Sequence, residues 1–422
     1  MATLTLISVI VAAAAFFGWV SVRVCRLPIT IGTMLLTVVS SVTLIALSNV
    51  FPGLHRWAIS FVGHVQYENL ILHGLLSLLL FAGAFQLDLV FLAREKLSVS
   101  LLSIIGTLLT TGATSAVMYW ALPFIGIHPS WVECLFFGTL ISPTDPVAVL
   151  EMLHRVGVPR NIQAQLAGES LFNDGIGAVL FLAVLEASRG RQFSVGHLGG
   201  MLLLESGGGL LLGVCLAWIT SELMRRVNAY QVEILLTLAL ALGGYRLAEV
   251  MHLSAPLEAV AAGLALRRFN MTRSPGEISH EPIDSFWKVI DEVQNAILFV
   301  LLGLEVLVVP LSPQTFQSGA IAIGFLVAIR VVVVMLMLGL IRALQPGHKS
   351  SLLTLSWGGL RGGLSIALAL SVPDLHQHIW ILATTYIVVV FSIVIQGGSL
   401  DLFLRRFMTP NSRATQTAAA SS

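Results

Sequence analysis

Apolar segments of about 20 residues follow one another along almost the whole chain, and a helix needs about that length to cross the hydrocarbon core of a bilayer. No soluble core could bury so many of them, because 56% of the 422 residues are hydrophobic and only 11% are charged. The bilayer must therefore act as the solvent. The sequence predicts an all-α polytopic membrane protein in contact with membrane lipid, without a separate soluble domain.

The apolar windows give about thirteen candidate transmembrane helices. They cover residues 3–22, 28–50, 69–92, 97–121, 130–152, 163–188, 196–220, 231–250, 254–267, 288–309, 315–343, 350–372 and 376–400. The ninth is shorter than the others. Residues 401–422 follow the last candidate helix and are expected to form a short cytoplasmic tail.

Basic residues between these helices are distributed unevenly, which predicts the orientation of the chain. The odd-numbered connections and the tail hold Arg23, Arg26, Arg94, Lys96, Arg155, Arg160, Arg225, Arg226, Arg267, Arg268, Arg273, Arg342, Lys349, Arg405, Arg406 and Arg413. The even-numbered connections and the end of the eighth candidate helix hold Arg56, Arg189, Arg191 and Arg246. This asymmetry predicts an N-terminus outside and a C-terminus in the cytoplasm.

Two candidate helices carry residues that interrupt helices. The fifth contains LISPTDPVAVL, in which Pro143 and Pro146 flank Thr144 and Asp145, and each proline removes a backbone donor. The twelfth contains SWGGLRGGLSIAL, in which four glycines surround Arg361. If the seventh helix is a linker, the remaining twelve helices form two halves of six. Each interrupted segment is then the fifth helix of its half, and the second half has the opposite orientation in the membrane to the first. That arrangement is typical of inverted-repeat transporters with broken helices.

The sixth candidate helix contains GESLFNDGIGAVLF, which places polar side chains at helical spacing. Ser170 and Asp174 are four residues apart, and so are Glu169 and Asn173, so they form adjacent polar stripes. The Asp174 carboxylate, the Ser170 hydroxyl and oxygens of Thr144 and Asp145 are hard ligands suited to a small cation, and equally to a proton. Competition at one carboxylate that is exposed alternately to each side is sufficient for exchange.

Charged side chains within apolar segments need partners or water. The basic residues in question are Lys288, Arg330 and Arg361. Glu169 is a natural partner for a buried arginine, with Arg330 the first choice and Arg361 the second. Glu258 and Glu305 stand near predicted helix ends, where we expect them to reach water.

Several other classes of protein fit the sequence poorly. The chain contains no HExxH and no GxSxG motif, so an intramembrane enzyme or a resident cofactor is not indicated. The formal net charge of +1 suggests no nucleic-acid partner. The isolated Cys25, Cys134 and Cys215 have neither metal-ligand nor disulfide spacing. A cation channel remains an alternative, although a channel needs no proton coupling.

The ordered motifs SPTDPVAV, GESLFNDGIGAVLF, VIDEVQNAILFVLLGLEV, AIRVVVV and WGGLRGGLSIALAL span most of the chain. Together they resemble the monovalent cation:proton antiporter family, which includes the bacterial NhaP exchangers and the eukaryotic sodium/proton exchangers. The resemblance implies an NhaA/NhaP-like fold, a homodimer and a mobile six-helix core. The core would comprise roughly 97–188 and 315–400, the dimerisation scaffold 3–92 and 231–309, and the linker 196–220.

The same resemblance implies roles for individual residues. Asp174 matches the ion-binding and proton-binding aspartate, Asn173 the asparagine before it, and Ser170 a ligand position. Thr144 and Asp145 match the unwound fifth helix. Glu169 and Arg330 match an ion pair of the core, and Arg361 matches the arginine beside the second broken helix.

The asparagine before the aspartate accompanies electroneutral exchange in this family. One position departs from the pattern: Ala82 stands in LLLFAGAFQLD where many relatives carry a glutamate, and Asp88 is expected to be an interfacial residue and no substitute for it.

We therefore expect a secondary antiporter in the inner (plasma) membrane of a bacterium that exchanges a monovalent cation for protons. Sodium is the first candidate, lithium a further one, and potassium/proton exchange on the same fold is the alternative. The expected ion site comprises Asp174, Asp145, Thr144, Ser170 and Asn173, with sodium at the first four. Glu169, Arg330 and Arg361 would support it structurally.

Overall fold

The computed structural model describes most of the chain, and nearly all of it is helical. The described residues are 3–25, 29–47, 53, 74–146, 149–150, 153, 158–188, 195–227, 229–271, 281–307, 309, 312–345, 351–372 and 379–400. Within these ranges the only β-type pairing is an isolated antiparallel bridge between Asp145 and Leu360. The predicted tail, 401–422, lies outside the described residues.

The helices follow the predicted apolar segments. They are α1 (Thr3–Val20), η1 (Ser21–Cys25), α2 (Ile29–Ala46), α5 (Leu76–Gln86), α6 (Leu89–Arg94), α7 (Lys96–Ser100), η3 (Leu101–Gly106), α8 (Thr107–Ala121), η4 (Leu122–Ile125), α9 (Trp131–Ile141), α11 (Arg160–Ser188), α12 (Val195–Met224), α13 (Tyr230–Val250), α14 (Ala255–Met271), α15 (Glu281–Glu305), α16 (Pro313–Leu344), α17 (Leu352–Trp357), α18 (Gly363–Leu370), α19 (Ile379–Val390) and η5 (Phe391–Gly397). Here η1, η3 and η5 are π-helical and η4 is a 3-10 turn.

By length and composition, seven helices of the described chain can cross a membrane. They span Ile7–Cys25, Lys96–Ile125, Arg160–Ser188, Leu204–Met224, Tyr230–Val250, Pro313–Leu344 and Ile379–Leu400. Shorter apolar helices lie at Ile31–Ala46, Leu76–Gln86 and Trp131–Ile141. The prediction of an all-α membrane protein is therefore confirmed. The predicted number of thirteen crossings remains a prediction, because several of those segments are short or broken.

Local sequence explains where several helices begin. The Ser130 hydroxyl accepts a hydrogen bond from the Glu133 amide, and the Glu133 carboxylate accepts one from the Ser130 amide, which forms a capping box at the start of α9. Ser312 caps α16, which starts with Pro313. Asp88 caps α6 and is exposed, so the predicted helix 69–92 is divided at this residue. Its expected place at the membrane interface remains a prediction.

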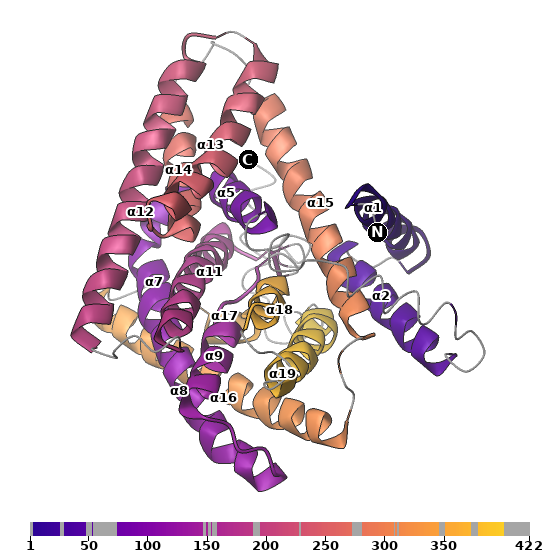
Figure 1. Ribbon diagram of the computed structural model, residues 1–422. Coiled ribbons are helices and arrows are strands. Elements are labelled where there is room, and N and C mark those ends of the chain that lie inside the picture. The colour runs from indigo at the N-terminus through magenta and orange to yellow at the C-terminus, as the bar shows by residue number, and fades with distance from the viewer. Residues whose placement is uncertain are drawn as a thin grey trace, which may run out of the picture.

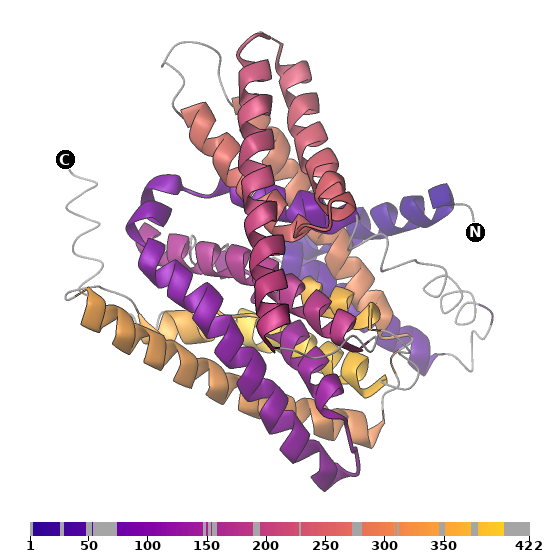
Figure 2. The same cartoon turned by 60° about the vertical axis from the view of Figure 1, so that its left-hand side comes forward.

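The helices form two groups joined through α11 (Figure 1). In one group α14 packs against α12, α13 and α5, while α15 packs against α2 and α5. In the other, α8 packs against α9 and α16, and α16 packs against α19; Figure 2 shows α16 crossing the lower part of the molecule beside α8. Helix α11 contacts α9 in the second group and α14 in the first. The helix that carries Asp174 therefore lies where the two groups meet.

Both predicted helix breaks are present. Helix α9 ends at Ile141, just before Pro143, and the chain is not helical from Pro143 to Pro146. Helix α17 ends at Trp357, and α18 begins at Gly363 after a non-helical stretch. The two interruptions therefore bring unwound backbone from distant parts of the chain into the interior.

Candidate functional site

The two unwound segments cross and are joined by backbone contacts. The Asp145 amide donates a hydrogen bond of 2.8 Å to the carbonyl oxygen of Leu360. Gly362 lies against the Asp145 side chain so closely that a Cβ at this position would collide with the Asp145 carboxylate. Glycine at position 362 is therefore what allows the second segment to approach Asp145.

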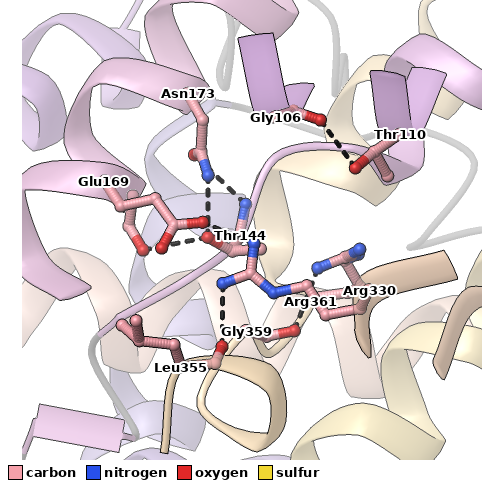
Figure 3. A network of polar contacts seen from close by, with 10 residues as sticks. Gly106, Thr110, Thr144, Glu169, Asn173, Arg330, Leu355, Gly359 and Arg361 are labelled. Atoms are coloured by element: carbon pink, nitrogen blue, oxygen red, sulfur yellow. Dashed lines mark hydrogen bonds and ion pairs between the residues drawn. The ribbon is translucent and has the colours of Figure 1, made fainter. Parts of the chain in front are cut away.

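Helix α11 holds the first unwound segment through a set of side-chain hydrogen bonds (Figure 3). The Asn173 Nδ2 donates to Thr144 Oγ1 at 2.8 Å, and Asn173 Oδ1 accepts from the Thr144 amide at 3.2 Å. Ser170 Oγ lies 3.0 Å from Thr144 Oγ1. All three residues are buried. The helix break leaves the Thr144 amide without a hydrogen-bond partner inside a helix, and the side-chain amide of Asn173 bonds both this amide and the Thr144 hydroxyl instead.

Asp174 and Asp145 are half-buried, unlike the fully buried residues around them. Their carboxylates are close enough for each to feel the charge of the other. Among the described residues, no side chain donates a hydrogen bond to the Asp174 carboxylate. Two neighbouring carboxylates, of which one lacks a donor, form a site that favours a cation or a proton.

The support residues are arranged as an ion pair and a backbone anchor. Arg330 Nη1 forms a salt bridge with Glu169 Oε1, and Arg330 Nη2 donates to the Leu355 carbonyl at 2.9 Å. Glu169 is 1% exposed and Arg330 7%, so the pair is desolvated. Of the two arginines considered as partners for Glu169, the structure selects Arg330. The pair links α11 and α16 to the end of α17.

Arg361 has different partners. Its Nη1 donates to the Gly359 carbonyl at 2.9 Å, and its backbone amide donates to Ser392 Oγ at 2.8 Å. Gln396, on η5 with Ser392, donates from Nε2 to the Trp357 carbonyl at 2.8 Å. Ser392 and Gln396 were not predicted from the sequence. Their spacing of four residues in the apolar run FSIVIQGG is the signal that could have revealed them.

Other charged residues lie apart from this cluster. The expectation that Glu258 and Glu305 reach water is wrong, because their exposures are 0% and 3%. Each stands near a helix end, but neighbouring helices cover both. Glu258, for example, is covered by α12, where Gly213 lies against its backbone, and by α13, where Gly244 lies against its carboxylate. Lys288, in contrast, is exposed on α15. Ala82 is completely buried, and because its side chain is a methyl group, this position contributes no ligand oxygen from its side chain.

In the described part of the chain, no group of three or more His, Cys, Asp or Glu side chains is placed to hold a metal ion. Cys25, Cys134 and Cys215 are all free thiols. What the residues of this site provide is a pair of carboxylates with hydroxyl and backbone oxygens, which suits a weakly held small cation.

Comparison with known proteins gives consistent matches over the whole chain. The family model described as "Sodium/hydrogen exchanger, transmembrane" matches residues 4–406. The chain is 36% identical over 410 residues to the Na(+)/H(+) antiporter NhaP of Pseudomonas aeruginosa, with 96% of each chain covered. It is 30% identical over 346 residues to the Na(+)/H(+) antiporter NhaH of Halobacillus aidingensis, with 81% of this chain and 83% of that protein covered.

The fold also has a counterpart among solved structures. The sodium proton antiporter MjNhaP1 of Methanocaldococcus jannaschii, determined at pH 8, superposes with a TM-score of 0.73. The alignment covers 96% of this chain and 99% of that chain at 18% sequence identity. At that identity the match bears on the fold.

Proposed function

Because this chain belongs to the sodium/hydrogen exchanger family, we propose that it is a secondary active antiporter exchanging sodium for protons across a membrane. The relatives that match 96% and 81% of this chain are named as Na(+)/H(+) antiporters, which favours sodium over potassium. Nothing in these relatives supports the potassium alternative. Lithium is a further candidate, since it has the same charge and prefers the same oxygen ligands.

One observation carries the mechanism: the half-buried Asp174 carboxylate lies within the electrostatic reach of Asp145, beside crossed segments of unwound backbone, and no described side chain donates a hydrogen bond to it. In this proposal Asp174 binds either a sodium ion or a proton. Asp145, Thr144 and Ser170 supply further oxygens to sodium. Because the two ions compete for one carboxylate, the site carries sodium in one direction and protons in the other when it is exposed alternately to each side.

Asn173 has a different role in the proposal, because both atoms of its amide are already bonded to Thr144. It therefore holds the unwound segment in place and adds no charge to the site. With one carboxylate exchanging its proton for one sodium ion, transport is electroneutral. The charge of the loaded site is then the same in both directions.

The division of the fold into two helix groups supports a movement of one against the other. The proposed moving core comprises roughly 97–188 and 315–400, which contains both broken helices and the Glu169–Arg330 pair. The proposed scaffold comprises 3–92 and 231–309, with 196–220 as linker. We also propose a homodimer in a bacterial plasma membrane, with the N-terminus outside and the C-terminus in the cytoplasm.

Purified protein in liposomes tests the proposed exchange. The lumen is made acidic and contains a trapped pH dye, and sodium, lithium or potassium is added outside. Sodium and lithium are expected to make the lumen alkaline, while potassium has little effect. Clamping the membrane potential at two values tests electroneutrality, because an electroneutral exchanger runs at the same rate at both. A channel would instead pass sodium without moving protons.

A further inference from the structure

A small cavity lined by both apolar and polar residues lies between α16, the α17–α18 break, and η5 with the end of α19. Its volume is ≈ 20 Å³, which is room for about one water-sized particle. The polar residues that line it are Arg330, Ser356, Gly359, Arg361, Ser392 and Gln396. Asp174 and Asp145 do not line it, so it is separate from the proposed transport site.

The cavity presents hydrogen-bond donors that have no partner. Within the described residues, Arg330 Nε, Arg361 Nε and the Ser356 hydroxyl are buried without one. Arg361 is only 4% exposed, so water from outside reaches it little. A buried donor without a partner is costly, and each of these groups gains from an occupant that accepts hydrogen bonds.

Apart from the Ser356 hydroxyl, which can accept as well as donate, the side-chain acceptors and the Gly359 carbonyl around the cavity are already in use. The Gly359 carbonyl accepts from Arg361 Nη1, and Ser392 Oγ accepts from the Arg361 amide. Gln396 Oε1 accepts from Ser392 Oγ at 3.3 Å. A water molecule needs partners for its own hydrogens as well as for its oxygen, whereas an anion only accepts. Two of the three free groups are guanidinium N–H donors that cannot accept, so the set favours an anion.

The local charge also favours an anion in the cavity. Arg330 and Arg361 lie against the same backbone: a Cβ on Gly359 would stand 2.6 Å from Arg330 Nε, and the Gly359 carbonyl binds Arg361. The two guanidinium groups repel each other, and among the described residues the carboxylate that acts on both is Glu169, which is bonded to Arg330 (Figure 3). Two buried cations thus share one anion, and a second negative charge would balance them.

We propose that this cavity binds one small inorganic anion of the halide class, such as chloride. Arg330 Nε, Arg361 Nε and the Ser356 hydroxyl donate to it. The bound anion stabilises the break between α17 and α18. This inference does not depend on the identity of the transported cation, and its test needs no transport measurement.

Thermal unfolding of the purified full-length protein in detergent tests the proposal. Sodium chloride or sodium bromide is compared with sodium gluconate at the same ionic strength, because gluconate is too large for the cavity. We expect the halides to raise the unfolding midpoint, and the rise to saturate with concentration as it does for a single site. A midpoint that is equal in all three salts, or that rises without saturation, overturns the proposal.

Variants locate the effect. Ser356→Ala and Arg361→Gln should weaken or abolish the halide-dependent shift. Ser371→Ala is the matched control, because its hydroxyl bonds the Ala367 carbonyl outside the cavity and the shift should remain. An unchanged shift in Ser356→Ala and Arg361→Gln means that the halide binds elsewhere. If Arg361→Gln fails to fold, anomalous scattering from crystals of the wild type in bromide decides: a peak in the cavity supports the site, and its absence there refutes it.

Discussion

Asn173 bonds Thr144 twice across the break in the fifth predicted helix, once through its amide nitrogen at 2.8 Å and once through its amide oxygen at 3.2 Å. The two residues are 29 positions apart in the chain. Thr144 precedes Asp145, so this contact fixes the segment that carries one of the two site carboxylates. Asn173 precedes Asp174, so the same contact fixes the position of the other.

Replacement of Asn173 by alanine should therefore weaken both the fold and the site. The change leaves the buried Thr144 amide without an acceptor, at a cost of about 1–3 kcal/mol. We expect a lower unfolding midpoint in detergent together with weaker sodium binding. Asn161→Ala, at the start of the same helix, is the control and should change neither quantity. An Asn173→Ala protein as stable as wild type would contradict this role.

The Glu169–Arg330 pair is buried, so removal of one partner should be strongly destabilising. Glu169→Gln or Arg330→Gln leaves the other charge unpaired in the interior, which costs about 3–5 kcal/mol. Unfolding midpoints of the single variants should fall well below that of wild type.

Arg246 and Glu249 provide the comparison, because their bridge joins side chains that are 72% and 19% exposed. Arg246→Gln should change stability by no more than about 1 kcal/mol. The assignment fails if the two buried single variants are as heat-stable as this control.

Gly362 is predicted to tolerate no side chain. A methyl group there would collide with the Asp145 carboxylate, so Gly362→Ala must shift either Asp145 or the second unwound segment. We expect a large loss of exchange in liposomes. Gly324→Ala is the control, since a Cβ at Gly324 on α16 meets nothing within 4 Å. Equal exchange activity of the two variants would mean that exchange does not require the close approach of Gly362 to Asp145.

Competition at one carboxylate predicts how exchange depends on pH. As the pH falls, protons occupy Asp174 and exclude sodium, so the apparent KM for sodium should rise. In the limit the rise is roughly tenfold for each pH unit, because one proton displaces one sodium ion. With equal pH on both sides, the maximal rate at saturating sodium should not fall as the pH is lowered, because the site must carry a proton on its return. A maximal rate that falls while KM is unchanged would indicate that the proton acts at another site.

Sequence reasoning was most successful where local chemistry determines structure. Pro143 and Pro146 interrupt any helix, and the glycines around Arg361 permit a second interruption, so both breaks could be predicted from short stretches. The polar stripe of Ser170 and Asp174 follows from helical periodicity alone. The apolar segments likewise identified the helices of the membrane fold.

Contacts between distant segments could not be predicted in the same way. The double bond from Asn173 to Thr144 depends on how α11 crosses the broken helix, which helical spacing does not specify. Arg330 was correctly placed ahead of Arg361 as the partner of Glu169, but only the packing of the helices decides between the two. Glu258 was expected at the surface because it stands near a helix end, but α12 and α13 cover that end.

The most direct test of the proposed mechanism is sodium-driven alkalinisation of acid-loaded liposomes by wild type and by Asp174→Asn. The substitution keeps the shape of the side chain but removes the carboxylate for which sodium and protons compete. We predict that sodium makes the lumen alkaline with wild type, and that the folded variant gives no signal at any pH. Proton movement by Asp174→Asn at a rate close to that of wild type would contradict the assignment of Asp174 as the shared site.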